Sequence, residues 1–218
     1  MRTLLLSFLI AITALADDKP FTMLTDELLA KQPEAQRAEW TAYIAQSRAF
    51  AAEEHRILDE ERTKAEAKPA PGNRAEFVFD SDTPTEWFAS AENQKLADIV
   101  ISYQTPSGGW SKAVDYAKGP RQPGTHWTAQ TGGAWHYCGT FDNRTTTEQI
   151  KFLAGVFTAT KRDDVKAALM KGLDYVFAAQ YPNGGWPHPA NSFMGWCSSD
   201  VGRRIDLVTW RHGKAEMR

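Results

Sequence analysis

The heptapeptide Gln-Thr-Pro-Ser-Gly-Gly-Trp at residues 104–110 recurs 76 residues later as Gln-Tyr-Pro-Asn-Gly-Gly-Trp at residues 180–186. Each copy follows apolar residues at helical spacing: Leu96, Ile99, Val100 and Tyr103 before the first, and Leu169, Leu173, Val176 and Phe177 before the second. Glycine adopts the positive φ at which helices commonly end, so each heptapeptide is predicted to stop a helix. Repeated units of this kind stack because one unit cannot bury its own apolar face. The repeat therefore predicts an all-α fold, a partial α/α toroid (barrel-like) of helix-turn-helix units with Gly-Gly-Trp turns.

Further helices are predicted between the two copies. Thr145 and Glu148 have the spacing of a capping box, which predicts a helix from about Thr146 to Thr160. The next helix is expected to be capped by Asp163 or Asp164. No alternating strand of any length interrupts this pattern, in agreement with an all-α class.

The chain before the repeat is predicted to consist of a leader followed by an arm. Residues 1–16 combine a basic start, a short apolar run and a small-residue cleavage site, the pattern of a secretory signal peptide. Residues 17–75 are predicted to form a charged helical arm and a Pro-rich linker. The arm is either a partner-binding element or a helical hairpin packed on the main domain. The mature protein is expected to be secreted or periplasmic, with no membrane contact after signal cleavage.

The remaining chain divides into a main helical domain at residues 76–188 and a divergent tail at residues 189–218. The tail has no helical apolar stripe. Cys138 and Cys197 are the only two cysteines, and they are too few to form a disulfide scaffold. Whether they pair stays open at this point, as does the oligomeric state.

The charge balance excludes several classes of function. The formal charge is -2, from 25 Lys and Arg against 27 Asp and Glu, so no broad cationic field exists to hold nucleic acid. Any polyanionic substrate would need a local patch. His126, His136 and His188 lack zinc-site spacing, and the sequence contains no P-loop, Rossmann fingerprint or serine elbow.

Four residues in the first turn or between the two copies are candidates for ligand binding. Asp142 and Asn143 stand just ahead of a predicted helix, and their oxygens suit a hard cation such as calcium, although a helix cap or a turn explains them equally well. Lys112 would place an ammonium group where it suits a sugar carboxylate, whereas an isolated loop lysine is usually only solvated. Trp110 suits sugar stacking, with a core anchor as the alternative.

Four stretches together resemble the pectate lyases of the tenth polysaccharide lyase family. These are QTPSGGWSK at 104–112, FDNRTTTEQIKFLA at 141–154, GLDY at 172–175 and AAQYPNGGWP at 178–187. The resemblance implies an α/α toroid-like domain that cleaves polygalacturonate, or pectin, by calcium-assisted β-elimination. In this reaction an arginine abstracts the C5 proton of a galacturonate and the bond at C4 breaks.

The resemblance also implies roles for individual residues. Asp142 corresponds to a catalytic-site aspartate close to calcium and substrate, and Asn143 follows it in the same motif. Lys112 corresponds to a contact with the substrate carboxylate. Ser111 stands where the family usually has proline and Thr145 where it usually has alanine.

The sequence departs from the family after about residue 188. The further acidic residue and the base arginine expected downstream are not identified, and Arg203, Arg204, Arg211 and Arg218 are not assigned that role. We therefore expect a truncated or frame-shifted homologue, a secreted pectate lyase relative that lacks the downstream catalytic half. The alternative is a non-catalytic module that binds acidic polysaccharide. A terpene-cyclase-like enzyme is disfavoured because the turns lack an Asp-rich diphosphate motif.

Overall fold

The computed structural model describes residues 29–65, 68–72, 77–80, 82–129, 139–182 and 184. The regular elements of these residues are α2 (Glu34–Arg62), α3 (Thr85–Ala89), α4 (Ala91–Ser102), η1 (Tyr116–Lys118), η3 (Asp142–Arg144), α5 (Thr147–Thr160) and α6 (Asp163–Ala178), where η marks a 3-10 helix. The only strand-like pairings within them are two isolated bridges, Lys68 with Thr125 and Gly72 with Val114. The predicted all-α class is confirmed, while closure into a toroid stays a prediction.

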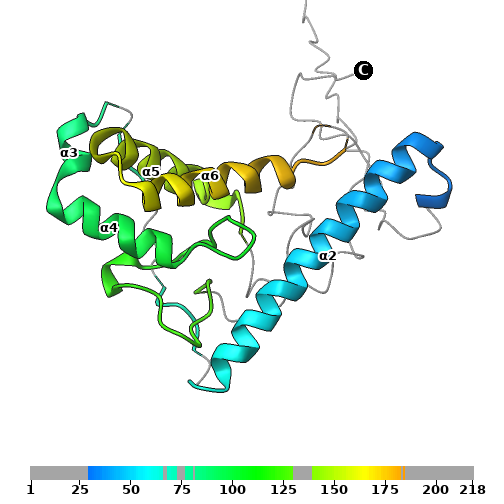
Figure 1. Ribbon diagram of the computed structural model, residues 1–218, viewed down its shortest axis with the longest axis horizontal. Helices are drawn as coiled ribbons and strands as arrows, with labels where there is room; N and C mark the ends of the chain where they lie inside the picture. The colour runs from blue at the N-terminus through cyan, green and yellow to red at the C-terminus, as the bar shows by residue number, and fades with distance from the viewer. Residues whose placement is uncertain are drawn as a thin grey trace, which may run out of the picture.

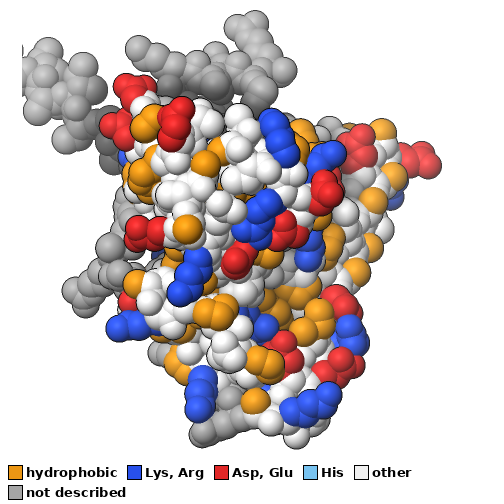
Figure 2. All heavy atoms as spheres, turned by 60° about the vertical axis from the view of Figure 1, so that its left-hand side comes forward, with side chains coloured by type: hydrophobic (Ala, Val, Ile, Leu, Met, Phe, Trp, Pro, Cys, Tyr) orange, Lys and Arg blue, Asp and Glu red, His pale blue; other side chains and the backbone are white. Residues whose placement is uncertain are grey.

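The main core surrounds α5, which packs against α3, α4 and α6 (Figure 1). Phe152, Leu153 and Val156 on α5 are fully buried, as the apolar spacing of the sequence predicts. Phe152 also packs edge-on against Phe77, with ring centroids 5.3 Å apart. Edge-to-face pairs of this kind stabilise a core beyond their buried area. The surface around the α3 and α4 end shows acidic and basic side chains interspersed with apolar ones, which agrees with the near-neutral charge (Figure 2).

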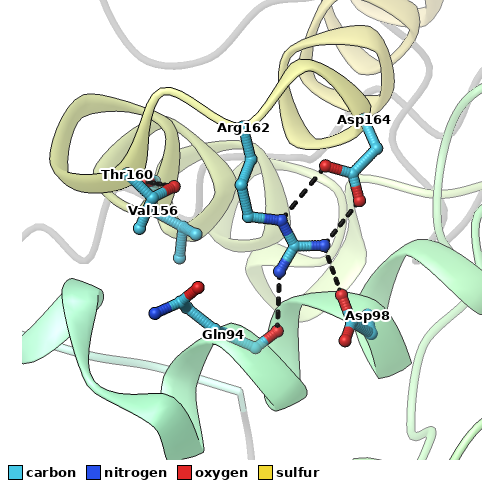
Figure 3. A network of polar contacts seen from close by, with 6 residues as sticks. All are labelled: Gln94, Asp98, Val156, Thr160, Arg162 and Asp164. Carbon is cyan, nitrogen blue, oxygen red and sulfur yellow. Dashed lines mark hydrogen bonds and ion pairs between the residues drawn. The ribbon is translucent and has the colours of Figure 1, made fainter.

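Arg162 joins the turn between α5 and α6 to α4 (Figure 3). The chain leaves α5 through Lys161, whose φ of 58° is left-handed. The guanidinium of Arg162 donates to the carboxylates of Asp98 and Asp164 and, at 3.3 Å, to the carbonyl oxygen of Gln94. Both carboxylates are largely exposed, so these ion pairs are expected to add no more than about 1 kcal/mol each.

The predicted capping box at the start of α5 is wrong. Thr146, not Thr145, precedes the helix, and no side chain caps its first turn. Glu148 accepts a hydrogen bond from the ammonium of Lys151 at 2.8 Å instead of reaching back to the helix start. The threonine hydroxyl is not available as a cap because Thr146 uses it to bind the backbone of Trp110.

The start of α6 also differs from the prediction. The N-cap residue is Arg162, with no side-chain cap, and Asp163 and Asp164 lie inside the first turn. Their negative charges still favour this end of the helix because the backbone dipole is positive there.

The two Gly-Gly-Trp turns share the same hydrogen bonds. The Nε2 of Gln104 donates to the carbonyl oxygen of Gly108 at 2.8 Å, and that of Gln180 donates to Gly184 at 2.8 Å. The amide of each glycine donates to the carbonyl three residues earlier, at 2.9 and 2.8 Å. Both glycines have positive φ, 106° and 83°. The sequence repeat is thus a structural repeat, although residues 183, 185 and 186 of the second copy lie outside the described residues.

The predicted arm contains α2, a single helix of 29 residues. It lies apart from α3 and α4 (Figure 1), and it contacts the main domain at the residues that follow α6 and at the loops between α4 and α5. Trp40 and Tyr43 pack against Tyr181, with ring centroids 5.6 and 5.5 Å apart. Near the other end, Glu61 accepts two hydrogen bonds from Arg121, at 3.0 and 2.6 Å. These contacts favour the packed arm over a free partner-binding arm.

Several predictions fall outside the described residues. These are the signal peptide at 1–16, the tail at 189–218, the cysteines Cys138 and Cys197, and the side chains of His136 and His188. Within the described residues, no helix combines the length and the apolar character needed to cross a bilayer.

Candidate functional site

The backbone of Trp110 joins the segment that carries Lys112 to the segment that carries Asp142. The amide of Trp110 donates to the Oγ1 of Thr146 at 3.0 Å, and its carbonyl oxygen accepts from the amide of Thr140 at 2.9 Å. Lys112 follows Trp110 by two residues, and Asp142 follows Thr140 by two residues. The structure therefore brings together the two segments in which the sequence predicted substrate and cation binding.

Two glycines allow these segments to approach closely. A Cβ atom added to Gly109 or Gly139 would lie 2.8 Å from the ring of Tyr175, and about as close to the Cα of the other glycine, 3.0 and 2.9 Å respectively. Any side chain at either position would thus force the segments apart. The sequence indicated Gly109 as part of a turn. Gly139 was not singled out, although a glycine shortly before Asp142 was a signal of close backbone contact.

Strained backbone is concentrated at this junction. Five non-glycine residues among those described have positive φ, and four of them lie here: Ala113, Asn143, Arg144 and Thr146. A positive φ is unusual for any side chain and a marked outlier for β-branched threonine. Such strain costs about 1–3 kcal/mol per residue and persists where the surroundings enforce it, often at functional sites. No sequence pattern used above could have located this cluster.

The candidate residues differ in exposure. Asn143 is exposed and Lys112 is half-buried, so both lie where a ligand can reach part of the side chain. The backbone of Asp142 opens η3, next to the left-handed Asn143 with φ 50°. The side chain of Asp142 lies outside what the structure describes, so its predicted role stays a prediction.

Trp110 does not occupy a binding surface, which corrects its predicted role in substrate binding. Its side chain is 0% exposed, and its Nε1 donates to the carbonyl oxygen of Val100 at 2.8 Å. The ring contacts the core next to Gly172, where an added Cβ would lie 3.0 Å from it. The core-anchor interpretation of this tryptophan is the one that the structure supports.

Calcium fits the chemistry of this site only in part. Calcium takes six to eight oxygen ligands, and the Asp142–Asn143 pair offers a carboxylate and an amide oxygen. Among the described residues, however, no three His, Cys, Asp or Glu side chains are grouped so that they could hold a metal ion. A calcium ion at this place would therefore need further oxygen ligands, such as backbone carbonyls or groups of a bound ligand.

Two of the described arginines, Arg121 and Arg162, are engaged in structural ion pairs. Arg121 is paired with Glu61 and stacks on Trp127, 4.0 Å from its ring centroid. Arg162 is paired with Asp98 and Asp164. These guanidinium groups are committed to holding helices and loops together. The four arginines of the tail lie outside the described residues.

Comparison with known proteins yields one family and a small number of solved structures. Residues 104–194 match the family model described as pectic acid lyase. One similar structure is an aspartate-to-alanine mutant of a family 10 polysaccharide lyase from Cellvibrio cellulosa, in complex with trigalacturonic acid. It is 26% identical to this chain, with a TM-score of 0.36. The match covers 52% of this chain and 33% of that one. The family 10 polysaccharide lyase from Cellvibrio cellulosa is 25% identical with a TM-score of 0.37, over 59% of this chain and 39% of that one. No curated protein matches the chain.

The matched segment and the site coincide. The chain spans only 33% to 39% of the length of these two lyases. Residues 104–194 nevertheless contain both Gly-Gly-Trp turns, Lys112 and the Asp142–Asn143 pair. The resemblance predicted from those motifs is confirmed, and this stretch of the chain matches the pectic acid lyase family.

Proposed function

We propose that this chain is a pectate lyase homologue that binds polygalacturonate through Lys112 and the Asp142–Asn143 segment. The observation that carries the proposal is the pair of backbone contacts at Trp110, which places both segments side by side within the stretch that matches the lyase family. The ammonium group of Lys112 suits a chain of sugar carboxylates, because it attracts a carboxylate directly.

We further propose that calcium is shared between the protein and the substrate. Asp142 and Asn143 would contribute oxygens, and the galacturonate carboxylates would supply further oxygen ligands. A calcium ion held there would supply positive charge to the substrate carboxylate. Binding of polygalacturonate is accordingly expected to weaken when calcium is removed by a chelator.

The chemistry proposed for a complete site is β-elimination. Lys112 would neutralise the carboxylate of the galacturonate, which makes the C5 proton more acidic. A base would take that proton, and the C4–oxygen bond would break to leave an unsaturated sugar. The base is not assigned; an arginine would take this role, as the family resemblance implies. We also propose export of the protein, on the signal pattern of residues 1–16.

The test measures binding and turnover separately on the same purified chain. Co-sedimentation with insoluble polygalacturonate, with calcium or with chelator, measures binding, and the ultraviolet absorbance of the unsaturated product measures elimination. Asp142→Ala and Lys112→Ala are expected to reduce binding, whereas Lys118→Ala, an exposed lysine on η1 in the same loop region, is expected to leave binding unchanged. If the folded wild-type chain does not bind polygalacturonate under any of these conditions, the proposal is wrong.

The second candidate function is a non-catalytic module that binds acidic polysaccharide through Lys112 and Asp142 without a base. Binding that depends on calcium, without any unsaturated product, would support this alternative. Product formation that disappears in Asp142→Ala would instead show that a base, from the tail or from a second subunit, completes the site.

A further inference from the structure

Glu54, in the middle of α2, is a fully buried carboxyl group, with 1% of its surface exposed. Its Oε1 accepts a hydrogen bond from the hydroxyl of Ser107 at 2.8 Å, while its Oε2 has no hydrogen-bond partner. Burying an ionised carboxylate is costly unless it is paired, so a half-satisfied one strongly favours its neutral, protonated form. Such a group requires an explanation, because no other buried residue described in α2 carries a carboxyl group; these residues are Trp40, Tyr43, Ser47 and Leu58.

The groups that face Glu54 come from two other parts of the chain. Ser107 and Thr105 belong to the first Gly-Gly-Trp turn, and Lys171 and Tyr175 belong to α6. Burial raises the pKa of Glu54 to about 8, even though hydrogen bonds from the turn and the charge of Lys171 act in the opposite direction. The carboxyl is thus neutral at mildly acidic pH and becomes charged in the mildly alkaline range.

The turn that Glu54 holds leads directly to the candidate site. Thr105 contacts the hydroxyl of Ser107 at 2.9 Å, and its own amide donates to the carbonyl oxygen of Gly109 at 2.9 Å. The next residue, Trp110, is bonded to Thr146, at the end of the segment that carries Asp142. A continuous series of hydrogen bonds therefore links α2 to both segments of the site.

We propose that Glu54 is a positioning residue: by holding Ser107 it fixes the first Gly-Gly-Trp turn, and through Trp110 it sets the relative placement of Lys112 and the Asp142–Asn143 segment for binding of polygalacturonate. This inference rests on the proposed function of that site. It also makes α2 part of the scaffold of the site.

The proposal predicts a particular dependence on pH. A docked α2 keeps the proton of Glu54, whereas a released α2 loses it near the ordinary carboxyl pKa. Docking therefore weakens as the pH rises from about 5, and the effect levels off above about pH 8. Where release of α2 limits binding, the dissociation constant for polygalacturonate rises by up to about tenfold per pH unit in this range.

The experiment compares Glu54→Gln with a matched control, Glu53→Gln. Both variants remove one carboxylate from α2, but Glu53 is exposed and pairs with Arg56. Calcium-dependent binding of polygalacturonate is measured from pH 5 to 9. Glu54→Gln, which stays neutral, is expected to flatten the profile, and Glu53→Gln is expected to reproduce the wild-type slope. Identical profiles for wild type and Glu54→Gln would overturn the proposal.

A second measurement separates failure of this proposal from failure of the proposed function. Hydrogen exchange of residues 105–112 and 140–146 is compared between Glu54→Gln and Ser107→Ala, with the amides of α5 as the reference for global unfolding. Ser107→Ala is expected to raise exchange in both segments by about tenfold relative to α5, because the buried hydrogen bond between Ser107 and Glu54 is lost. If wild type binds no polygalacturonate, unchanged exchange still overturns the positioning role, and raised exchange supports it.

Discussion

At the scale of single residues, Trp110 stabilises the fold because its side chain lies in the turn but is buried in the core. Trp110→Ala is expected to lower the free energy of unfolding by about 3–5 kcal/mol, because it removes a fully buried ring and its bond to Val100. Trp110→Phe keeps most of the ring and should cost markedly less. Denaturant unfolding gives both values. Since the ring does not face a ligand, Trp110→Phe is expected to bind polygalacturonate as wild type does, and a selective loss of binding would contradict the core assignment.

Thr146 also stabilises the junction, because its hydroxyl accepts a hydrogen bond from the buried amide of Trp110. Thr146→Val removes the hydroxyl at constant shape and leaves that buried amide unpaired, which is expected to cost about 1–3 kcal/mol of unfolding free energy. Thr146→Ser keeps the bond and should stay close to wild type. Thr147→Val is the control, since Thr147 only bonds the carbonyl of Arg144 at the surface. Equal losses for Thr146→Val and Thr147→Val would show that the junction is not held in this way.

The residues of this junction mark the limit of what the sequence could predict. Lys112 was selected because it follows a repeated turn, and Asp142 because it stands just ahead of a predicted helix. The sequence did not reveal Thr146, since a β-branched residue with positive φ is disfavoured by local preference and exists only because tertiary contacts enforce it. The capping box at Thr145 was wrong because the helix starts one residue later, after Thr146, whose hydroxyl binds the backbone of Trp110 instead of capping the helix.

At the scale of elements, the contact between Glu61 and Arg121 fastens the end of α2 to the loop before Trp127. Arg121 makes two parallel hydrogen bonds to the carboxylate, and the amide of Gly124 donates to it as well, at 2.9 Å. Arg121→Lys cannot form the paired bonds and is expected to cost about 1–2 kcal/mol, whereas Arg121→Ala also loses the stacking on Trp127. A double-mutant cycle with Glu61→Gln measures the coupling. A coupling energy near zero would contradict this role of the pair.

The helices themselves could largely be predicted, but their docking could not. The spacing of apolar residues located the segments that became α4, α5 and α6, and a helix within the arm. The sequence did not single out Glu54 or Glu61, although both follow Trp40 at multiples of seven residues and both contact the main domain. The partner of each carboxyl lies more than fifty residues away in the chain, so helical spacing within the arm could not identify it.

At the scale of the whole molecule, the two carboxyls give the stability of the folded chain opposite dependences on pH. Burial raises the pKa of Glu61, but the stronger combined effect of Arg121 and the Gly124 amide holds it below its usual value. The stabilisation from Glu61 is therefore lost as the pH falls through the acidic range. Burial raises the pKa of Glu54 to about 8, so its contribution is greatest at low pH and declines as the pH rises toward 8.

These opposite signs predict a stability maximum in the mildly acidic range. Between about pH 5 and 8 the unfolded chain releases the proton that folded Glu54 retains, so the free energy of unfolding falls by up to about 1.4 kcal/mol per pH unit from this group. Glu54→Gln cannot ionise and is expected to remove that decline. Glu61→Gln is expected to reduce only the loss of stability at acidic pH. Denaturant unfolding at a series of pH values measures both slopes. A wild-type stability that increases from pH 5 to 8, with the same slope in Glu54→Gln, would show that the buried carboxyl does not govern the alkaline limb.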